Sequence, residues 1–220
     1  MAAAETWLLL LLSLFIPASG GWTGWTEGQT VLALASWSGL EGERLFCGSR
    51  SHNIKVWRKE AVREEDVKLR ETIRGTEVQA ADAVYGGWVD EADLEGHVGR
   101  VEALAVSGGR LYSGSSDGTV RVWGCGDLKC QRVVDAHQDA VMALCLWEEG
   151  GSVVSGSLDG SVKTWREASM EGGLEMRPPP FSANPHTGEQ RPPGVRCMLA
   201  TRGGLAFGGY LDCTVRAWDL

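Results

Sequence analysis

The residue types of a serine hydrolase occur twice in this chain of 220 residues. One group is His97, Ser113 and Asp117, and the second is His137, Ser155 and Asp159. In a hydrolase the serine attacks, the histidine takes its proton and the aspartate orients the histidine. Such an enzyme also needs a pocket with oxyanion donors, and the chain contains no G-x-S-x-G motif. Catalysis by these groups therefore competes with a structural role.

Metal and phosphate chemistry find little support in the sequence. The pair Cys125 and Cys130 has no second Cys/His pair at zinc spacing. No Walker-type loop is present, and no G-x-G-x-x-G follows a strand-like run. We therefore predict neither a metal nor a cofactor. The scattered spacing of the six cysteines fits a reduced protein better than a disulfide scaffold: Cys47, Cys125, Cys130, Cys145, Cys197 and Cys213.

The composition describes a folded, acidic protein. Lys plus Arg number 21 and Asp plus Glu 29, so the net charge is −8. That balance argues against a nucleic-acid partner, which requires a basic surface. The 43% of hydrophobic residues allows a real core. The 30 glycines and 10 tryptophans are typical of short strands joined by tight turns.

An internal repeat organises the chain. Four segments end in tryptophan, with a β-branched residue three positions earlier and a base two positions earlier: 49–57, 115–123, 157–165 and 210–218. Their period-two alternation predicts strands with one buried face. Each segment follows two further strand-like runs, so the unit is strand, turn, strand, turn, strand. Asp117-Gly118 and Asp159-Gly160 are strong hairpin signals between the last two strands.

These units resemble the WD-repeat family, whose repeat opens with Gly-His and closes with Trp-Asp. Gly96-His97 opens the second unit and Trp218-Asp219 closes the fourth. The resemblance covers about residues 28–220 and implies an all-β, WD-repeat β-propeller with four recognisable blades. We expect the blades at about 28–95, 96–135, 136–190 and 191–220, with insertions at 58–87 and 170–193.

The second and third units are similar to the propeller of plant-type zinc-finger proteins with WD repeats. The stretches that carry this similarity end at Trp123 and Trp165. The RNA-binding finger of those proteins needs three Cys and one His close together, and this chain has no such cluster. Nucleic-acid binding is therefore not carried over.

The resemblance also implies a role for the two Ser, His and Asp groups. In WD repeats these side chains and the closing tryptophan form a hydrogen-bonded set: His97, Ser113, Asp117 and Trp123, then His137, Ser155, Asp159 and Trp165. The fourth unit keeps Asp212 and Trp218 but has Gly208 at the serine position, and the first has Cys47 and Ser51. We expect the first and fourth blades to be less stable by ~1–3 kcal/mol each.

The function implied by the resemblance is a non-catalytic scaffold or adaptor that binds other proteins or peptides through blade-face loops. The candidate binding face is Arg50, Arg100, Ser116, Gln138, Asp139, Leu158 and Leu211. The Trp-Asp-x-Arg signature of ubiquitin-ligase receptors is absent at all four closing tryptophans. The alternative is a secreted or enzymatic propeller that uses a central pocket.

Residues 1–20 form an apolar leader. Its ten-residue run Trp7–Ile16 is too short to span a bilayer and has the length of a signal-peptide apolar region. Glu5 precedes it without any Lys or Arg, so a buried strand or a false start stays open. The cysteines favour an intracellular location, cytoplasmic or nuclear, whereas a cleaved leader would direct the chain to the secretory pathway.

The last unit stops after its third strand-like run. We therefore expect part of a larger propeller. A closed ring of four blades and an assembly with another chain stay open, so the sequence leaves the oligomeric state unassigned.

Overall fold

The structure is a computed structural model that describes residues 30–40, 42–60, 88–178 and 192–220. All regular elements in these ranges are strands, so the described residues include no helix that could cross a membrane. The leader 1–20 lies outside the described residues, as do positions 61–87 of the first predicted insertion and 179–191 of the second.

The described strands form four antiparallel sheets, each built from strands that follow one another along the chain. The first sheet contains β1 (Val31–Gly39), β2 (Gly42–Ser49), β3 (Ile54–Lys59) and β4 (Trp88–Leu94). The second contains β5 (Val101–Ser107), β6 (Arg110–Ser115), β7 (Thr119–Gly124) and β8 (Cys130–Asp135). The third contains β9 (Val141–Trp147), β10 (Ser152–Ser157), β11 (Val162–Arg166) and β12 (Gly172–Met176). The fourth contains β13 (Val195–Ala200), β14 (Leu205–Tyr210) and β15 (Val215–Asp219). The predicted all-β fold with four blades is confirmed.

One strand lies where the sequence analysis expects an insertion. β12 falls within 170–193 and pairs antiparallel with β11, for example through Lys163 and Glu175. Its sequence, Gly-Gly-Leu-Glu-Met, lacks the apolar alternation that marks the other strands. The backbone ladder with β11 holds it in place instead.

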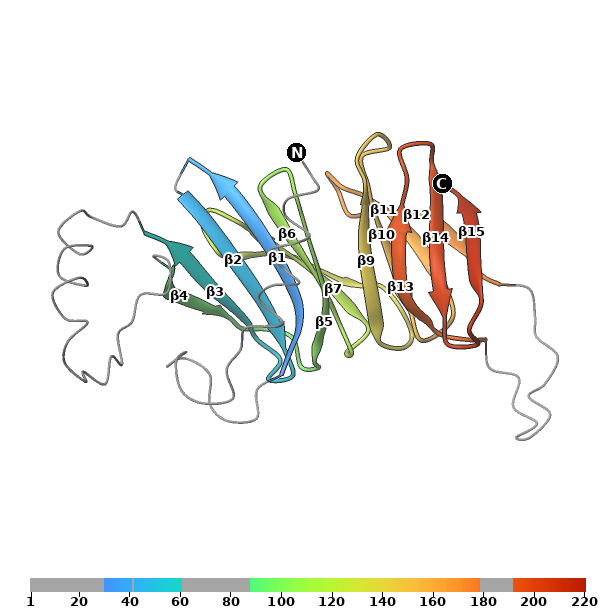
Figure 1. Ribbon diagram of the computed structural model, residues 1–220, viewed down its shortest axis with the longest axis horizontal. Coiled ribbons are helices and arrows are strands. Elements are labelled where there is room, and N and C mark those ends of the chain that lie inside the picture. The colour runs from blue at the N-terminus through green and yellow to red at the C-terminus, as the bar shows by residue number, and fades with distance from the viewer. Residues whose placement is uncertain (1–29, 41, 61–87, 179–191) are drawn as a thin grey trace, which may run out of the picture.

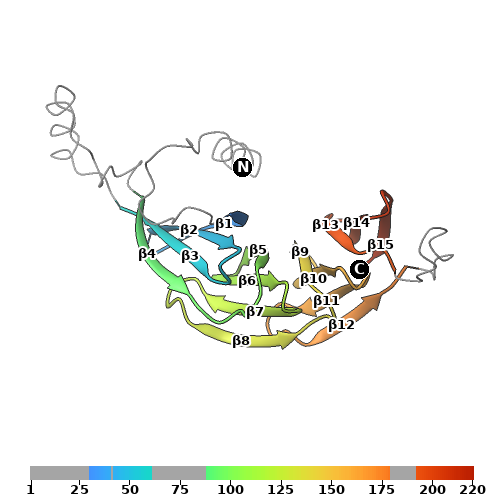
Figure 2. The same ribbon diagram turned by 90° about the horizontal axis from the view of Figure 1, so that it is seen from below.

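The four sheets stand side by side in an open arc (Figure 1 and Figure 2). The inner strands β1, β5, β9 and β13 contact their neighbours along the concave side. The outer strands β4, β8 and β12 follow the convex side in Figure 2. The first and fourth sheets occupy the two ends of the arc.

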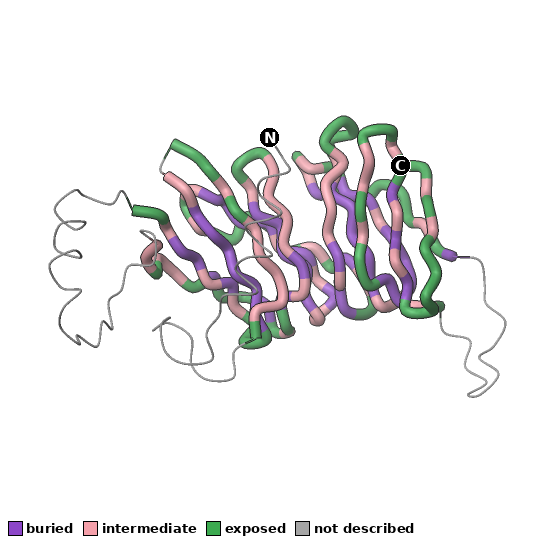
Figure 3. Tube along the Cα trace, in the orientation of Figure 1, coloured by how far each residue is buried: buried purple, intermediate pink, exposed green. Residues whose placement is uncertain are grey.

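The hydrophobic core lies between successive sheets. Phe46, Ile54 and Val56 of the first sheet pack against the second, through residues that include Leu111 and Trp123. Tyr112, Val120 and Val122 meet Val153 and Trp165 of the third sheet in the same manner. The third interface joins Val154 and Val162 to Val195 and Tyr210. Figure 3 shows buried positions in the middle strands and exposed positions at the turns.

Local sequence explains the hairpins between the second and third strands of a sheet. In the second sheet Gly118 has a φ of 82°, and its N–H donates to the Ser115 carbonyl over 3.1 Å. Only glycine adopts that backbone conformation without strain. The third sheet repeats the turn at Gly160, also with a φ of 82°. These turns fix which residues of the two strands pair.

Candidate functional site: buried hydrogen-bond sets and an exposed rim

The second blade brings four predicted residues together in one chain of hydrogen bonds. The Trp123 indole N–H donates to Ser113 Oγ over 2.9 Å, and Ser113 Oγ lies 2.8 Å from His97 Nε2. His97 Nδ1 lies 3.0 Å from Asp117 Oδ2. Because Asp117 accepts at Nδ1, the neutral imidazole carries its proton there and Nε2 accepts from the serine. Each donor in the set thus has an acceptor.

The charges of this set follow from burial and hydrogen bonding. Burial lowers the pKa of His97 below its ordinary value, against the raising effect of Asp117. Burial alone would raise the pKa of Asp117, but hydrogen bonds from Thr119, His97 and the Val98 N–H bring it well below the usual range. The stable pair is therefore a neutral imidazole beside a carboxylate.

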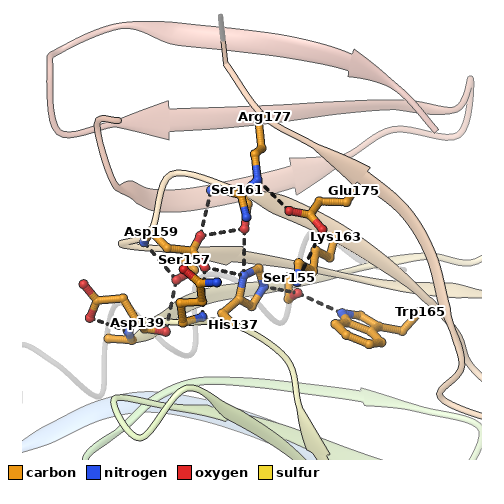
Figure 4. Close-up of polar contacts among 12 residues, drawn as sticks. His137, Asp139, Ser155, Ser157, Asp159, Ser161, Lys163, Trp165, Glu175 and Arg177 are labelled. Carbon is orange, nitrogen blue, oxygen red and sulfur yellow. Dashed lines mark hydrogen bonds and ion pairs between the residues drawn. The ribbon is translucent and has the colours of Figure 1, made fainter. Parts of the chain in front are cut away.

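The third blade repeats the arrangement (Figure 4). Trp165 Nε1 donates to Ser155 Oγ over 2.8 Å, and Ser155 Oγ lies 2.7 Å from His137 Nε2. His137 Nδ1 lies 2.9 Å from Ser161 Oγ and 3.3 Å from Asp159 Oδ2. Hydrogen bonds from His137 and Ser161 outweigh burial and hold the pKa of Asp159 below its usual range. Both sets link the loop before a blade to its middle strands.

The two serines that could act as nucleophiles are enclosed. Ser113 and Ser155 are both fully buried. Each Oγ is already bonded to an indole N–H and an imidazole nitrogen. A substrate carbonyl would have to displace these partners in a packed interior. The geometry therefore favours a structural role for these hydrogen bonds over hydrolysis.

The fourth blade has only the turn part of the set. Asp212 Oδ1 accepts from the Thr214 N–H and hydroxyl over 3.1 and 2.6 Å, as Asp117 does from Thr119. Arg216 Nη2 donates to Asp212 Oδ2 over 2.8 Å, in the place that histidine takes in the second blade. With Gly208 at the serine position, the Trp218 indole N–H lacks the serine acceptor that Trp123 and Trp165 have.

The first blade has a different turn. Ser51 Oγ donates to Asn53 Oδ1 over 2.7 Å and lies 2.6 Å from Ser49 Oγ. Cys47 stands at the serine position, opposite Lys55. Burial raises the pKa of the Cys47 thiol to about 12, against the lowering effect of Lys55. The thiol is therefore a packed, neutral group rather than a nucleophile.

Sequence reasoning missed an arginine clamp between the first two sheets. Arg44 is buried, and its Nη1 donates to the carbonyls of Cys125 and Gly126 over 2.5 and 3.0 Å. Its Nε and Nη2 also donate to the Glu91 carboxylate, each over 2.7 Å. Arg110 occupies the equivalent position and donates over 3.0 Å to the carbonyl of Glu167, in the turn between β11 and β12. The Arg-Leu-aromatic pattern shared by 44–46 and 110–112 is the signal that could have found it.

The predicted binding face lies along one rim of the arc. We define the rim as the turns after β2, β6, β10 and β14 with the loops that precede β1, β5, β9 and β13. One hydrogen bond recurs in all four sheets, from the first turn N–H to the loop carbonyl: Arg50 to Thr30, Ser116 to Arg100, Leu158 to Ala140 and Leu211 to Gly194, over 2.8–3.2 Å. The bottom edge of Figure 1, where β14 ends, is part of this rim.

The side chains of the rim differ in exposure. Arg50, Arg100, Gln138, Asp139 and Leu211 are exposed, whereas Ser116 and Leu158 are half-buried. Ser116 Oγ accepts from the Arg100 N–H over 2.8 Å, and Asp139 Oδ1 accepts from the Ala140 N–H over 2.7 Å. Val98 is also exposed on this rim, although its ordinary sequence context gave no signal. The rim thus presents charged, polar and apolar groups on loops held by repeated backbone bonds.

Metal ligands do not gather within the described ranges. No group of three or more His, Cys, Asp or Glu side chains there could hold a metal ion. All six cysteines are described, and all are free thiols. Cys125 is buried with its pKa raised to about 12, whereas Cys130 is exposed. The two therefore differ in surroundings and form no common site.

Sequence comparison assigns the middle of the chain. Residues 89–124 and 128–166 match the WD40 family, described as WD domain, G-beta repeat. These ranges include the second sheet and strands β9, β10 and β11 of the third, and they hold the two complete hydrogen-bond sets. These two stretches are WD repeats, and they lie within an all-β fold of four blade-like sheets.

Individual proteins show the same similarity over short stretches. Cell division control protein 4 of Candida albicans is 35% identical over 98 residues, 44% of this chain and 13% of that protein. Zinc finger CCCH domain-containing protein 17 of Oryza sativa subsp. japonica is 40% identical over 60 residues, 27% of this chain and 14% of that protein. The chain thus matches only a small part of these relatives.

One solved structure extends the comparison of the fold. The computationally designed Ika4 protein aligns with a TM-score of 0.59 and 23% sequence identity. The alignment covers 89% of this chain and 94% of that one. At this identity the likeness concerns the fold alone.

Proposed function

We propose that the protein is a scaffold or adaptor that binds a protein or peptide partner along the rim and has no catalytic activity of its own. The observation that carries this proposal is the recurrent backbone bond that holds four turns, with exposed Arg50, Arg100 and Leu211, on one rim. A mixture of charged, polar and apolar groups is what protein interfaces use. The WD40 match over 89–124 and 128–166 supports the same role.

The buried serines support the non-catalytic part of the proposal. A fluorophosphonate probe, which labels activated serines, should leave Ser113 and Ser155 unmodified in the folded protein because both are fully buried. Mass spectrometry of the labelled peptides measures this. Modification of either serine under native conditions would contradict the proposal and revive the hydrolase interpretation.

The cysteines support an intracellular site of action. Cys130, Cys197 and Cys213 are exposed free thiols, which an oxidising compartment would tend to pair or modify. This observation favours the adaptor over a secreted propeller. The net charge of −8 favours a protein partner over a nucleic acid, and this preference is part of the proposal.

A matched pair of surface variants tests the rim. The rim variant replaces Arg50, Arg100 and Leu211 with alanine, and the control variant replaces Gln131, Arg132 and Val133, which are exposed on β8. Both are used for affinity purification with quantitative mass spectrometry from the source cells. We expect the rim variant to lose the proteins that the wild-type chain and the control retain. Equal recovery with both variants would refute binding through the rim.

A further inference from the structure

On the rim, the turn of one sheet touches the loop that leads into the next sheet. Between the third and fourth sheets, a Cβ built on Gly194 would lie 2.8 Å from Leu158 Cδ2 and 2.9 Å from its Cα. Leu158 and Arg50 are equivalent, because both donate the recurring rim bond from a turn. Gly194 and Arg100 are equivalent, because both accept that bond in a loop. The repeat therefore places Arg50 beside Arg100 between the first and second sheets.

The first junction carries two cations at positions that are uncharged elsewhere on the rim. The equivalent pairs are Ser116 with Ala140 at the second junction and Leu158 with Gly194 at the third. Arg50 and Arg100 are both exposed, in a chain whose net charge is −8. Because two like charges side by side repel each other, an acidic group from another molecule would be attracted to this pair.

The acidic side chains of the chain leave the two arginines largely available. Arg50 forms no ion pair with a carboxylate among the described residues. Arg100 Nε lies 3.6 Å from Glu102 Oε1, but the Arg100 side chain is 49% exposed, and so exposed an ion pair contributes little in water. Glu95 is exposed in the loop before β5 and, within the described ranges, pairs with neither arginine. Both guanidinium groups can therefore accept a carboxylate through two parallel hydrogen bonds.

An apolar side chain flanks the arginines. Val98 lies in the loop that contains Arg100 and is 79% exposed. Its N–H donates to Asp117 Oδ2 over 3.0 Å, which fixes this part of the loop to the buried hydrogen-bond set. The junction lies between the first and second sheets, away from the outer faces of the arc (Figure 2). An apolar residue of a partner would bury Val98 while a neighbouring acidic residue meets an arginine.

We propose that the first junction of the rim binds an acidic segment of a protein partner. Asp or Glu carboxylates of that segment pair with Arg50 and Arg100, and an adjacent apolar residue covers Val98. A short acidic segment can reach both arginines, whereas the net charge of −8 repels a long phosphate backbone from the surrounding surface. The proposal rests on the rim function proposed above and names the chemistry of its partner.

Fluorescence anisotropy with labelled peptides tests the charge complementarity. The probes are a peptide of alternating Glu and Val and matched peptides in which Lys or Gln replaces Glu. We expect the wild-type chain to bind the Glu peptide most tightly. Its affinity should fall as salt shortens the Debye length from about 10 Å at 0.1 M to about 3 Å at 1 M. No measurable binding of the Glu peptide, or equal binding of all three peptides, overturns the proposal.

Charge reversal locates the binding on the surface. The double variant Arg50→Glu, Arg100→Glu should bind the Glu peptide at least about 10-fold more weakly and should bind the Lys peptide instead. That gain also shows that the variant is folded at the rim. The control Lys129→Glu, Arg132→Glu makes the same change in net charge at exposed positions of the second sheet. An equal loss in the control, or a junction variant that does not gain the Lys peptide, overturns the proposal.

A neutral variant separates this proposal from the rim function itself. Arg50→Gln, Arg100→Gln is compared with the alanine rim variant in the affinity purification described above, and we expect both to lose the same proteins. If only the alanine variant loses them, binding through the rim stands and the acidic partner is refuted. If both variants retain them, the rim function fails as well. An oligothymidine probe that binds the wild-type chain more tightly than the Glu peptide also overturns the proposal, in favour of nucleic acid.

Discussion

The second and fourth blades have the same turn between their second and third strands, but different hydrogen bonds connect this turn to the rest of the blade. In both, an aspartate accepts two hydrogen bonds from the residue two positions on: Asp117 from Thr119, and Asp212 from Thr214. Only in the second blade does the aspartate continue through His97 to the buried core. The hydrogen-bond set therefore consists of two separable parts. A local part shapes the turn, and a long-range part joins the turn to the closing tryptophan.

The first blade has a third arrangement, in which the described contacts include a side chain outside the hydrogen-bond set. Ser49, Ser51 and Asn53 form the turn, and no aspartate occupies its tip. The Arg44 clamp fixes this sheet to the second through two carbonyls. The first sheet thus keeps the arginine contact to its neighbour, which the second sheet also has through Arg110, although it lacks the long-range part of the set.

The largest effect should come from the closing tryptophans. Trp123→Ala should lower the free energy of unfolding by ~3–5 kcal/mol, because it removes a buried ring and leaves a cavity. Trp218→Ala should cost clearly less, since its ring is only partly buried and no serine hydroxyl accepts from its N–H. Urea denaturation of both variants measures the difference. Equal losses would show that the fourth blade is as tightly packed as the second.

The aspartates sharpen the comparison. Asp117→Ala should cost ~2–3 kcal/mol, because His97 Nδ1, Thr119 and the Val98 N–H lose a charged acceptor in a partly buried site. Asp212→Ala should cost much less, because its partners Thr214 and Arg216 can turn to water. Thermal unfolding with each variant checks this. A cost for Asp212→Ala that matches the one for Asp117→Ala would refute the division into two parts.

The pH dependence of stability near neutral pH should report His97, which belongs to the long-range part. The pKa of His97 is lowered in the folded chain, so below its ordinary value of about 6.5 the unfolded chain binds more protons than the folded one. Stability should therefore fall as the pH drops from about 7.5 to about 5. The lowered pKa values of Asp117 and Asp159 add a further loss in more acidic solution.

The control for this measurement is His97→Gln, followed by thermal unfolding across the same range. The variant should be less stable at neutral pH, and its melting temperature should depend less on pH. An unchanged slope would assign the pH dependence to other groups.

The smallest effect should come from the turn residues with positive φ. His52 and Cys213 have φ values of 70° and 63° at the position where the second and third blades have glycine. Cys213→Gly should stabilise the protein by ~0.5–1 kcal/mol, because it removes the left-handed strain of an L-residue. Gly118→Ala should have the opposite sign, since its Cβ would lie 2.7 Å from the His137 carbonyl oxygen. A destabilised Cys213→Gly chain in urea would show that the thiol makes contacts worth more than the strain.

Sequence reasoning succeeded where structure is local. The alternation around Val120 and Val162 and the Asp-Gly pairs predicted strands and hairpins, because side-chain period and turn conformation are properties of a few neighbouring residues. The family resemblance added the partners of His97 and His137. The part of the site that could not be predicted joins residues of different sheets. Arg44 reaches Cys125 across 81 positions, and the Arg-Leu-aromatic pattern around Arg44 does not by itself name the partner on the next sheet.

The fourth blade illustrates the same limit. Asp212 and Trp218 suggested a set with Gly208 at the serine position, but the structure gives Asp212 a partner in Arg216. The sequence did not indicate that arginine would take the place of histidine beside Asp212. A base two positions before the tryptophan occurs in every unit, so Arg216 did not stand out. The fourth unit has neither a histidine four positions before Val195 nor a serine at position 208, so the set does not link this turn to the core.

At each described junction between sheets, the valine that begins an inner strand packs onto a glycine of the preceding sheet: Val101 on Gly48, Val141 on Gly114 and Val195 on Gly156. This valine–glycine contact has a consequence for how the arc could change in length. Each junction is made by two short features inside one repeat, so every repeat carries both halves of the contact with its neighbours. A duplicated repeat would therefore contain the valine and the glycine that pack against its neighbours. It would stand at the same angle to them, and no second mutation would be needed to pack it. The curvature of the arc is therefore set between neighbouring sheets. The number of blades can change while the angle between two adjacent blades stays the same.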